Sequence, residues 1–315
     1  MSGDLHPIVC FGGLMHAVTM RVDAVPAEGE TVLGFDYDEP YDGGKAADYA
    51  VAAVRLGAPV AMVTLVGSDE RGARWGERLA EEGIDTSAFQ TLEGPTDVGF
   101  AFLPESRVPA MISICDLTWQ MTPAVVRRAA DAFAAAAFVV ASLECRPEAV
   151  VAAFELGRAA GAQTILNAAP AIPLPDELAA LTDVLVVNEH EAAVITGEQG
   201  EIPALAGALR RRFPALHVIV TAGEQGAYLA SPTSQLLHVP AVRVPEVADT
   251  SGAGDAFVGG LAARLWHGDD LPAAVAYAAR VASVSVMGMS TMSSYPTAAE
   301  LDAALARIEG AAAAS

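Results

Sequence analysis

Short apolar runs that end in glycine or asparagine alternate with alanine-rich amphipathic stretches along most of the chain. The runs predict strands over residues 8–12, 60–66, 138–143, 164–167, 184–188 and 218–221. The amphipathic stretches predict helices over residues 44–56, 70–82, 123–135, 147–160, 189–196, 203–213, 254–266, 271–287 and 298–308. Strands that alternate with helices favour a mainly parallel sheet covered by helices on both faces. The sequence therefore predicts an α/β fold.

Two segments lack a helical period and alternate apolar with polar residues. They cover residues 30–41 and 97–114, and they predict short antiparallel strands. Because they neighbour the N-terminal half of the sheet, we expect them to form a small flap over the site. We expect residues 1–315 to form a single domain that includes this flap.

The composition argues against several classes of partner. The 39 acidic and 18 basic residues give a net charge of −21, which repels nucleic acid and anionic membranes. An uninterrupted apolar run long enough to span a membrane is not found in the sequence, and its N-terminus has no basic region typical of a signal peptide. Three widely spaced cysteines predict a reducing cytoplasm: Cys10, Cys115 and Cys145.

In parallel sheets, ligands bind beyond the carboxyl ends of the strands. The polar stretches that follow the predicted strands are GSDE (67–70), SLE (142–144), NAAP (167–170), NEHE (188–191) and TAGEQG (221–226). These stretches have the polar and glycine-rich character that a binding site needs.

The segment VADTSGAGDAFVGGLAARL (247–265) carries the clearest chemistry. A helix that begins after Ser-Gly-Ala-Gly offers free N–H groups and close backbone approach to an anion. We predict that Gly252, Ala253 and Gly254 form an anion hole and that Asp255 acts as a general base toward an attacking hydroxyl. The alternative is a helix that simply carries an acid in its first turn, after a tight glycine turn.

Two signatures in order resemble a known family. DTSGAGDAFVGG (249–260) and YDGGKAADYAVAAVRLGAPVAMVTLVGSDERG (41–72) resemble the C- and N-terminal signatures of the ribokinase-like (PfkB-type) carbohydrate kinases. Within that family the pattern is most similar to the ribokinases. The resemblance implies a three-layer α/β/α fold with a mainly parallel central sheet and a small β lid. It also implies transfer of a phosphoryl group from ATP to a hydroxymethyl group of a sugar, with Mg²⁺ and often K⁺. Homodimers that pair through the lid are expected by the same resemblance.

The resemblance assigns a nucleotide side. Asn188 and Glu191 match an Asn-x-x-Glu motif, in which Glu191 orders waters on Mg²⁺; the alternative is a capping box at a helix start. Thr221, Gly223 and Gly226 match a nucleotide loop, for which the alternative is a plain hairpin; Gly254 also faces the nucleotide. The predicted K⁺ site uses carbonyl oxygens of Asp249 and Ser251, with others from the segment Ser285 to Ser294, in which Ser285, Ser290 and Ser294 are the candidates. Ser290 stands where the family usually has glycine, which leaves K⁺ dependence open.

The sugar side departs from the family. Gly43, Gly44, Lys45 and Glu144 match, together with Asp255, but Met15 and Ala17 stand in place of an Asn and an Asp, and Asp48 replaces an Asn. Three interpretations remain open: His16 reaches the sugar, Asp48 takes over the lost contact, or the substrate is not plain ribose. A lone histidine beside an apolar run is more often structural.

Two alternative functions remain at this point. The apolar substrate positions also fit a nucleoside kinase of the same fold, and the altered sugar positions fit a non-catalytic regulator that binds nucleotide or sugar. Asp255, Asn188 and Glu191 argue against the regulator, because a binding protein does not need a base. A dinucleotide-binding enzyme is disfavoured, since GAGDAFVGG is not Gly-x-Gly-x-x-Gly after the first strand.

Overall fold

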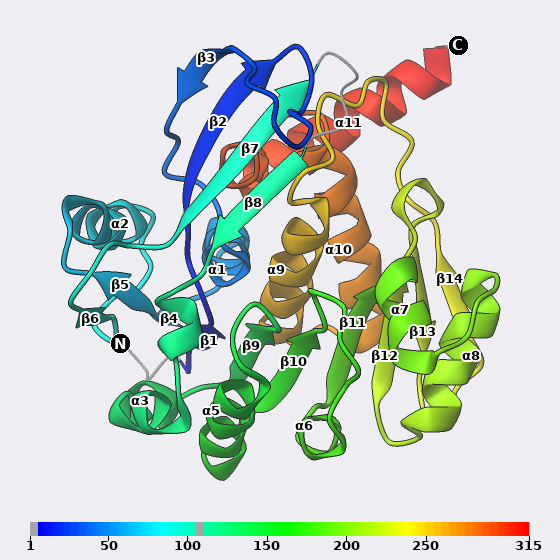
Figure 1. The fold of residues 1–315 in the computed structure, drawn as a ribbon. Coiled ribbons are helices and arrows are strands. Elements are labelled where there is room, and N and C mark those ends of the chain that lie inside the picture. The colour runs from blue at the N-terminus through cyan, green and yellow to red at the C-terminus, as the bar shows by residue number, and fades with distance from the viewer. Residues whose placement is uncertain (1–5, 105–109, 315) are drawn as a thin grey trace.

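The computed structural model describes residues 6–104 and 110–314 and has three layers (Figure 1). The central eight-stranded sheet has the order β14-β13-β12-β11-β10-β9-β1-β4. Its strands are β1 (Ile8–Phe11), β4 (Val60–Val63), β9 (Phe138–Ser142), β10 (Gln163–Asn167), β11 (Val184–Asn188), β12 (His217–Thr221), β13 (Ala227–Ala230) and β14 (Leu237–Val239). The six strands from β4 to β12 run parallel, and β13 and β14 are antiparallel. The mainly parallel α/β sheet that the sequence predicted is confirmed.

Helices cover both faces of this sheet, because strand residues alternate between two apolar cores. Ile8 and Cys10 contribute to the first core, and Val9 and Phe11 contribute to the second. Helices on the first side are α1 (Lys45–Arg55), α2 (Glu70–Glu81), α9 (Ala253–Trp266), α10 (Leu271–Ser285) and α11 (Ala298–Ala314). Helices on the second are α3 (Pro123–Arg128), α4 (Ala130–Phe133), α5 (Pro147–Ala159), α6 (Asp176–Ala180), α7 (Glu189–Thr196) and α8 (Ile202–Arg212).

A second sheet projects above the carboxyl ends of the central strands and forms the lid (Figure 1). Its order is β3-β2-β7-β8, with β2 (His16–Val22), β3 (Gly34–Asp38), β7 (Val98–Pro104) and β8 (Ala110–Ile114). The segments 30–41 and 97–114 supply three of these strands, although residues 105–109 lie outside the described residues. Within 97–114, β7 and β8 pair antiparallel as predicted, whereas β2, which the sequence did not indicate, pairs with β7 in parallel.

Several elements differ from the prediction. The segment 123–135 forms two short helices that meet at Ala129, and the chain adds α6, β2, β13 and β14, which the apolar pattern did not indicate. A further small sheet pairs β5 (Leu65–Gly67) with β6 (Gln90–Leu92). Within residues 6–104 and 110–314, every helix is too short or too polar to cross a membrane.

Candidate active site

The turn before α9 is the one for which the sequence predicted an anion hole. Gly252 has φ 70° and ends the loop in the left-handed conformation, and α9 begins at Ala253. Asp255 therefore lies in the first turn of the helix, where it is 8% exposed. The first N–H groups of a helix have few partners within it, although the Ala253 amide contacts the Thr250 carbonyl at 3.3 Å. This turn places amide donors next to a carboxylate.

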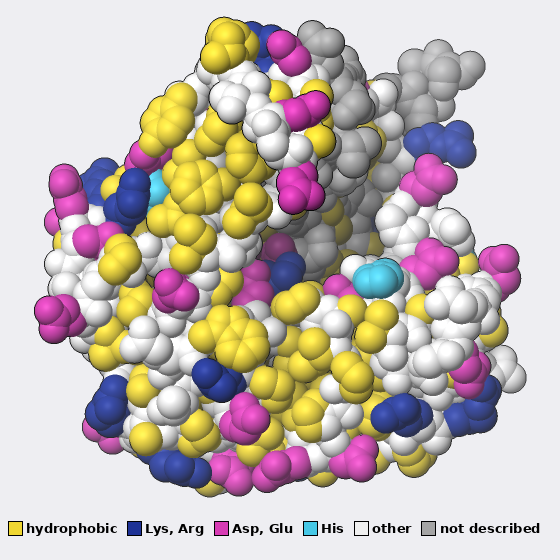
Figure 2. Space-filling model, in the orientation of Figure 1, with side chains coloured by type: hydrophobic (Ala, Val, Ile, Leu, Met, Phe, Trp, Pro, Cys, Tyr) yellow, Lys and Arg dark blue, Asp and Glu magenta, His cyan; other side chains and the backbone are white. Residues whose placement is uncertain are grey.

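Asp255 forms an ion pair with Lys45, the first residue of α1. Lys45 Nζ lies 3.1 Å from Asp255 Oδ1 and 3.5 Å from Oδ2, and the Lys45 amide donates to Glu144 Oε2 at 2.9 Å. The two side chains of the ion pair remain 26% and 11% exposed. Figure 2 shows a hollow below the lid with acidic and basic side chains at its floor. Both side chains of the ion pair thus keep part of their surface exposed.

Burial and neighbouring charges shift the pKa values of Lys45 and Glu144 in opposite directions. Burial disfavours the charge of Lys45, but the negative charges of Asp255 and Glu144 outweigh it and raise the pKa of the Lys45 ammonium. Burial raises the pKa of the Glu144 carboxyl, although Lys45 lowers it. Gly44 precedes Lys45 with φ 90°, and a Cβ there would lie 2.5 Å from Leu14 Cα, so only glycine fits. The structure brings the matched sugar-side residues together: Gly43, Gly44, Lys45, Glu144 and Asp255.

A cleft of about 880 Å³ extends from this turn toward the last strands of the sheet. Ala253 and Gly254 lie at one end, and Val286 of the segment after α10 lines its side. Thr221, Gly223 and Gly226 lie at the other end, in the loop between β12 and β13. This loop is also a hairpin, because β12 and β13 are antiparallel. Thr221, Gly223 and Gly226 therefore share one cleft with Ala253 and Gly254 of the turn before α9.

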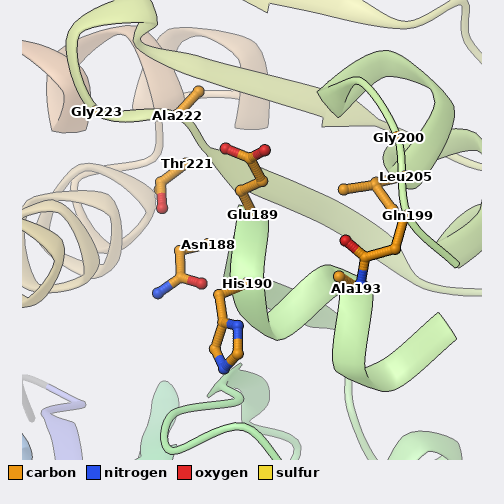
Figure 3. Close-up of a pocket in the computed structure, with 10 residues that line it drawn as sticks. All are labelled: Asn188, Glu189, His190, Ala193, Gln199, Gly200, Leu205, Thr221, Ala222 and Gly223. Atoms are coloured by element: carbon orange, nitrogen blue, oxygen red, sulfur yellow. The ribbon is translucent and has the colours of Figure 1, made fainter. Parts of the chain in front are cut away.

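A second pocket of about 450 Å³ adjoins the cleft, and both are lined by Thr221 and Gly223. Figure 3 shows Asn188 close to Thr221, where β11 and β12 end as paired neighbours. Asn188 caps α7: its side chain accepts from the Glu191 amide at 2.8 Å, and Glu191 Oε2 accepts from the Asn188 amide at 2.8 Å. Burial raises the pKa of Glu191. The capping box is thus present, and the nucleotide roles of both residues remain predictions.

Known proteins are similar to this chain over most of its length. The sequence profile of the pfkB family carbohydrate kinases matches residues 6–298. The chain belongs to this family. The ribokinase of Staphylococcus aureus is 32% identical over 288 residues, which cover 90% of this chain and 94% of that protein. The deoxyribokinase of Salmonella typhi is 35% identical over 297 residues, which cover 92% and 95%. The ribokinase-like resemblance is confirmed.

Solved structures support the fold. The structure of Arabidopsis thaliana ribokinase complexed with ribose and ATP superimposes with a TM-score of 0.87 over 95% of this chain and 98% of that chain, at 22% identity. This carbohydrate kinase therefore has the three-layer fold and β lid that the family resemblance implied.

Two of the residues that depart from the family, Met15 and Ala17, lie beside the Gly43–Gly44 turn. The Met15 amide lies 3.4 Å from the Gly43 carbonyl, and a Cβ at Gly43 would lie 3.9 Å from Ala17 Cβ. Met15 and Ala17 thus adjoin the Gly43–Gly44 turn and supply no charged group there.

His16 lies inside the protein with 0% exposure. Its Nε2 lies 2.9 Å from Glu39 Oε2, and its ring packs edge-on against Tyr41, with 4.7 Å between ring centroids. Within the described part of the chain, Nδ1 has no hydrogen-bond partner. These contacts favour the structural interpretation of His16, and its role in binding substrate remains a prediction.

The predicted K⁺ residues lie in the loop before α9, at the end of α10 and in the segment after α10, and Asp249 joins the first to the last of these. The Asp249 carboxylate accepts from the Ser251 amide at 2.9 Å and from the Ser290 amide at 3.0 Å. Ser290 has φ 70°, so it adopts the left-handed conformation for which glycine is usual. Ser285 donates to the Ala282 carbonyl, and Ser294 donates to the Thr291 carbonyl. A cluster of three or more His, Cys, Asp or Glu able to hold a metal ion is not found among the described residues.

Sequence reasoning missed a set of residues around the loop 290–295. Arg55 on α1 donates to the carbonyls of Met292 and Tyr295 at 2.6 and 2.8 Å, and the Tyr295 hydroxyl donates to the Gly252 carbonyl at 3.2 Å. Asp42 accepts from the Met292 amide at 2.8 Å. Asp42 directly precedes Gly43, and this position in the signature is the sequence signal that was available.

Proposed function

We propose that this kinase transfers the γ-phosphoryl group of ATP to a primary hydroxyl group of a five-carbon sugar, with Asp255 as general base. The observation that carries this proposal is the position of Asp255: it lies in the first turn of α9, beside Gly252–Gly254, at the end of a cleft that reaches Thr221 and Gly223. Relatives named ribokinase and deoxyribokinase favour a sugar over a nucleoside, and they disfavour a non-catalytic regulator.

The chain's own residues supply four contributions. An Asp255 carboxylate oxygen accepts the proton of the sugar hydroxyl as its oxygen attacks phosphorus. The amides of Ala253 and Gly254, at the positive end of α9, stabilise the negative charge on the transferred group. Lys45 holds Asp255 at 3.1 Å, so that the carboxylate is oriented before the substrate arrives. The lid excludes water, so that the phosphoryl group is not lost to hydrolysis.

Metal ions are part of the proposal. Glu191 and Asn188 at the start of α7 would hold Mg²⁺ through water, and oxygen donors at a helix terminus near the cleft fit that ion. When bound, Mg²⁺ neutralises charge on the phosphate oxygens. Carbonyl oxygens of Asp249 and Ser251, with others from residues 285–294, would hold K⁺. The left-handed Ser290 fits this site, because it gives the loop the backbone conformation that glycine would give.

We propose that the sugar presents a face with few hydroxyl groups to Met15 and Ala17. Neither side chain offers a charged acceptor. A site without such an acceptor gains no binding free energy from a sugar hydroxyl group placed there. This chemistry suits a deoxypentose at least as well as ribose. The enzyme should accept 2-deoxyribose with a kcat/KM equal to or above that for ribose, measured by coupled ADP release.

Ala17→Asp should reverse this preference. A carboxylate at this position accepts hydroxyl hydrogen bonds, and a charge-assisted bond contributes about 1.5–3 kcal/mol, or about 10- to 100-fold in the ratio of kcat/KM for ribose over 2-deoxyribose. Ala17→Leu, similar in shape to Asp but apolar, is the control and should not favour ribose. An unchanged sugar preference in Ala17→Asp would show that residue 17 does not face the sugar.

We propose that the kinase is a cytoplasmic homodimer that pairs through the lid. Hydrophobic side chains gather over the lid strands in Figure 2. Tyr37, Met111 and Ile112 are 64%, 69% and 57% exposed. Such a patch on a soluble domain is typical of an interface. Light scattering should give the mass of a dimer for the wild type and of a monomer for Met111→Glu, whereas Val194→Glu on α7 should remain dimeric. A monomeric wild type would reject this assembly.

A further inference from the structure

Acidic side chains connect the lid to the body of the protein at two places that differ in burial. At the base of β7 and β8, Asp97 is 3% exposed and accepts from the Leu117 and Thr118 amides at 2.9 Å each. Just after β3, the Glu39 side chain is 33% exposed. Glu39 lies four residues before Gly43, so it belongs to the connection between the lid and the sugar-side turn. Of the two connections, the one at Glu39 is more accessible to solvent and easier to open.

The Glu39 carboxylate contacts three elements. His16, the first residue of β2, donates from Nε2 to Glu39 Oε2 at 2.9 Å, and the Tyr37 hydroxyl on β3 donates to Oε1. Arg71 Nη2 on α2 lies 3.5 Å from Glu39 Oε2. The hydrogen bond from His16 lowers the pKa of Glu39 against the opposing effect of burial, and Arg71 lowers it further. One ionised carboxylate thus joins two lid strands to a helix of the body, and we call these four residues the clasp.

The helix α2 holds a fixed position beside the lid. Its N-cap residue Asp69 accepts from the Thr96 amide at 3.0 Å and from the Thr96 hydroxyl group at 2.6 Å, just before β7. Its Trp75 is 0% exposed and belongs to the first apolar core. Figure 1 shows α2 beside the lower ends of β2 and β7. Arg71 therefore reaches the clasp from a helix whose position is set by the core.

Burial makes His16 dependent on Glu39. The ring is 0% exposed, and its Nδ1 lacks a hydrogen-bond partner among the residues that the structure describes. Among the same residues, Glu39 is the hydrogen-bond partner of Nε2. A buried polar atom without a partner costs free energy, so loss of Glu39 would leave both ring nitrogens unpaired in the interior. The folded state therefore favours the position of Glu39 at the base of β2.

Tyr41 connects the clasp to the core. Its ring packs edge-on against His16, with 4.7 Å between the ring centroids, and edge-on against Trp75, with 5.7 Å. Tyr41 lies in the same connection as Glu39, directly before Asp42 and the Gly43–Gly44 turn. Movement of Glu39 would therefore move the sugar-side turn and loosen the packing over Trp75.

We propose that Glu39 is a positioning residue for the sugar: through the clasp it holds the lid and the Gly43–Gly44 turn together and sets the affinity for sugar, without taking part in phosphoryl transfer. His16 directly precedes Ala17, and a Cβ at Gly43 would lie 3.9 Å from Ala17 Cβ. The clasp thus fixes two segments that adjoin each other on the sugar side. This inference rests on the proposed function for its effect on sugar binding.

A broken clasp should weaken binding more than it slows turnover. Fewer molecules then have the closed lid before the sugar binds, and the apparent affinity for sugar falls by that fraction. Saturating sugar restores the closed lid, because the sugar binds that state better. The expected signature of a clasp variant is therefore a higher KM for sugar with a kcat near that of the wild type.

Glu39→Ala removes every contact of the carboxylate and should raise the KM for sugar by about tenfold or more, the effect of losing one hydrogen bond to a charged group. Glu39→Gln should raise it less, because the amide oxygen still accepts from His16 but offers no charge to Arg71. Steady-state kinetics with ribose and 2-deoxyribose measure both variants. A wild-type KM for sugar in active Glu39→Ala would overturn the proposal.

Glu155→Gln is the control for the change in charge. Glu155 on α5 lies 3.8 Å from Arg127 in an ion pair on the second side of the sheet, and its side chain is 50% exposed. This variant should keep the wild-type KM for sugar. An equal rise in KM in Glu155→Gln and Glu39→Gln would mean that the effect comes from net charge and not from the clasp.

Trp75 reports on the clasp without turnover. Trp119→Phe and Trp266→Phe together leave Trp75 as the only tryptophan of the chain. In this ligand-free background, Glu39→Ala should increase the quenching of Trp75 fluorescence by acrylamide, in proportion to the fraction of molecules with an open lid base. Equal quenching with and without Glu39→Ala would reject the clasp. This measurement separates failure of the clasp from failure of the proposed function, which Asp255→Asn tests.

Discussion

Asp255→Asn should lower kcat for sugar phosphorylation by about 10²- to 10⁴-fold, the usual contribution of a positioned general base. The amide has the shape of the carboxylate but cannot accept the hydroxyl proton. Lys45 Nζ, 3.1 Å from the carboxylate in the wild type, would contact the amide oxygen, so the turn should keep its geometry. The KM values for sugar and ATP should change by much less than kcat. Steady-state assays with ribose and 2-deoxyribose measure both parameters.

Asp270→Asn is the matched control for this prediction. Asp270 caps α10 and accepts from the Ala273 amide at 2.9 Å, so it is also an acid at a helix start. Asparagine caps helices as well as aspartate does, and this variant should retain wild-type activity. If Asp255 were only a helix-start acid, the two variants would behave alike. Thermal unfolding of both proteins would separate a loss of chemistry from a loss of folded enzyme.

Local patterns were sufficient to predict most of the central fold. The strands β1, β9, β10, β11 and β12 lie within about one residue of their apolar runs, because buried parallel strands are continuously apolar. The strand β2 was missed, since His16–Val22 is polar at several positions and belongs to a sheet that is exposed on part of its surface. The strands β13 and β14 are short, β14 lies at the edge of the sheet, and their pairing depends on the hairpin after Thr221.

In the candidate site, residues within one signature could be predicted from the sequence, but contacts between signatures could not. Gly252–Asp255 and Asn188–Glu191 could be proposed from the sequence because each lies in one local signature, where a few adjacent residues fix the backbone. The contacts that join signatures were not predicted, because they form only when distant segments pack together. Lys45 and Asp255 are 210 residues apart, and Asp48 and Thr291 are 243 apart. The replacement of an asparagine by Asp48 was visible in the sequence, but its hydrogen-bond partner was not.

The two glycines of the anion-hole turn should differ in what their replacement by alanine costs. Gly252 has φ 70°, and its Cβ would lie 2.5 Å from the Tyr295 hydroxyl oxygen. Gly252→Ala should therefore lose about 1–3 kcal/mol of unfolding free energy from backbone strain. It should also lose about 10²- to 10³-fold in kcat, as when one oxyanion donor is removed. Both losses come from displacement of the turn.

Gly254→Ala should lose activity without losing stability. Gly254 lines the cleft, and a Cβ there would meet nothing within 4 Å among the described residues. An alanine at a backbone conformation that it tolerates raises the unfolding free energy by about 0.4–1 kcal/mol. Its methyl group, however, occupies the space through which a phosphate group approaches the amides. The kcat/KM for ATP in Gly254→Ala should therefore fall by at least as large a factor as kcat falls in Gly252→Ala. Urea unfolding and steady-state kinetics of the two variants separate the effects. Normal turnover in Gly254→Ala would mean that the transferred group does not approach this turn, because the only change there is a methyl group in the cleft.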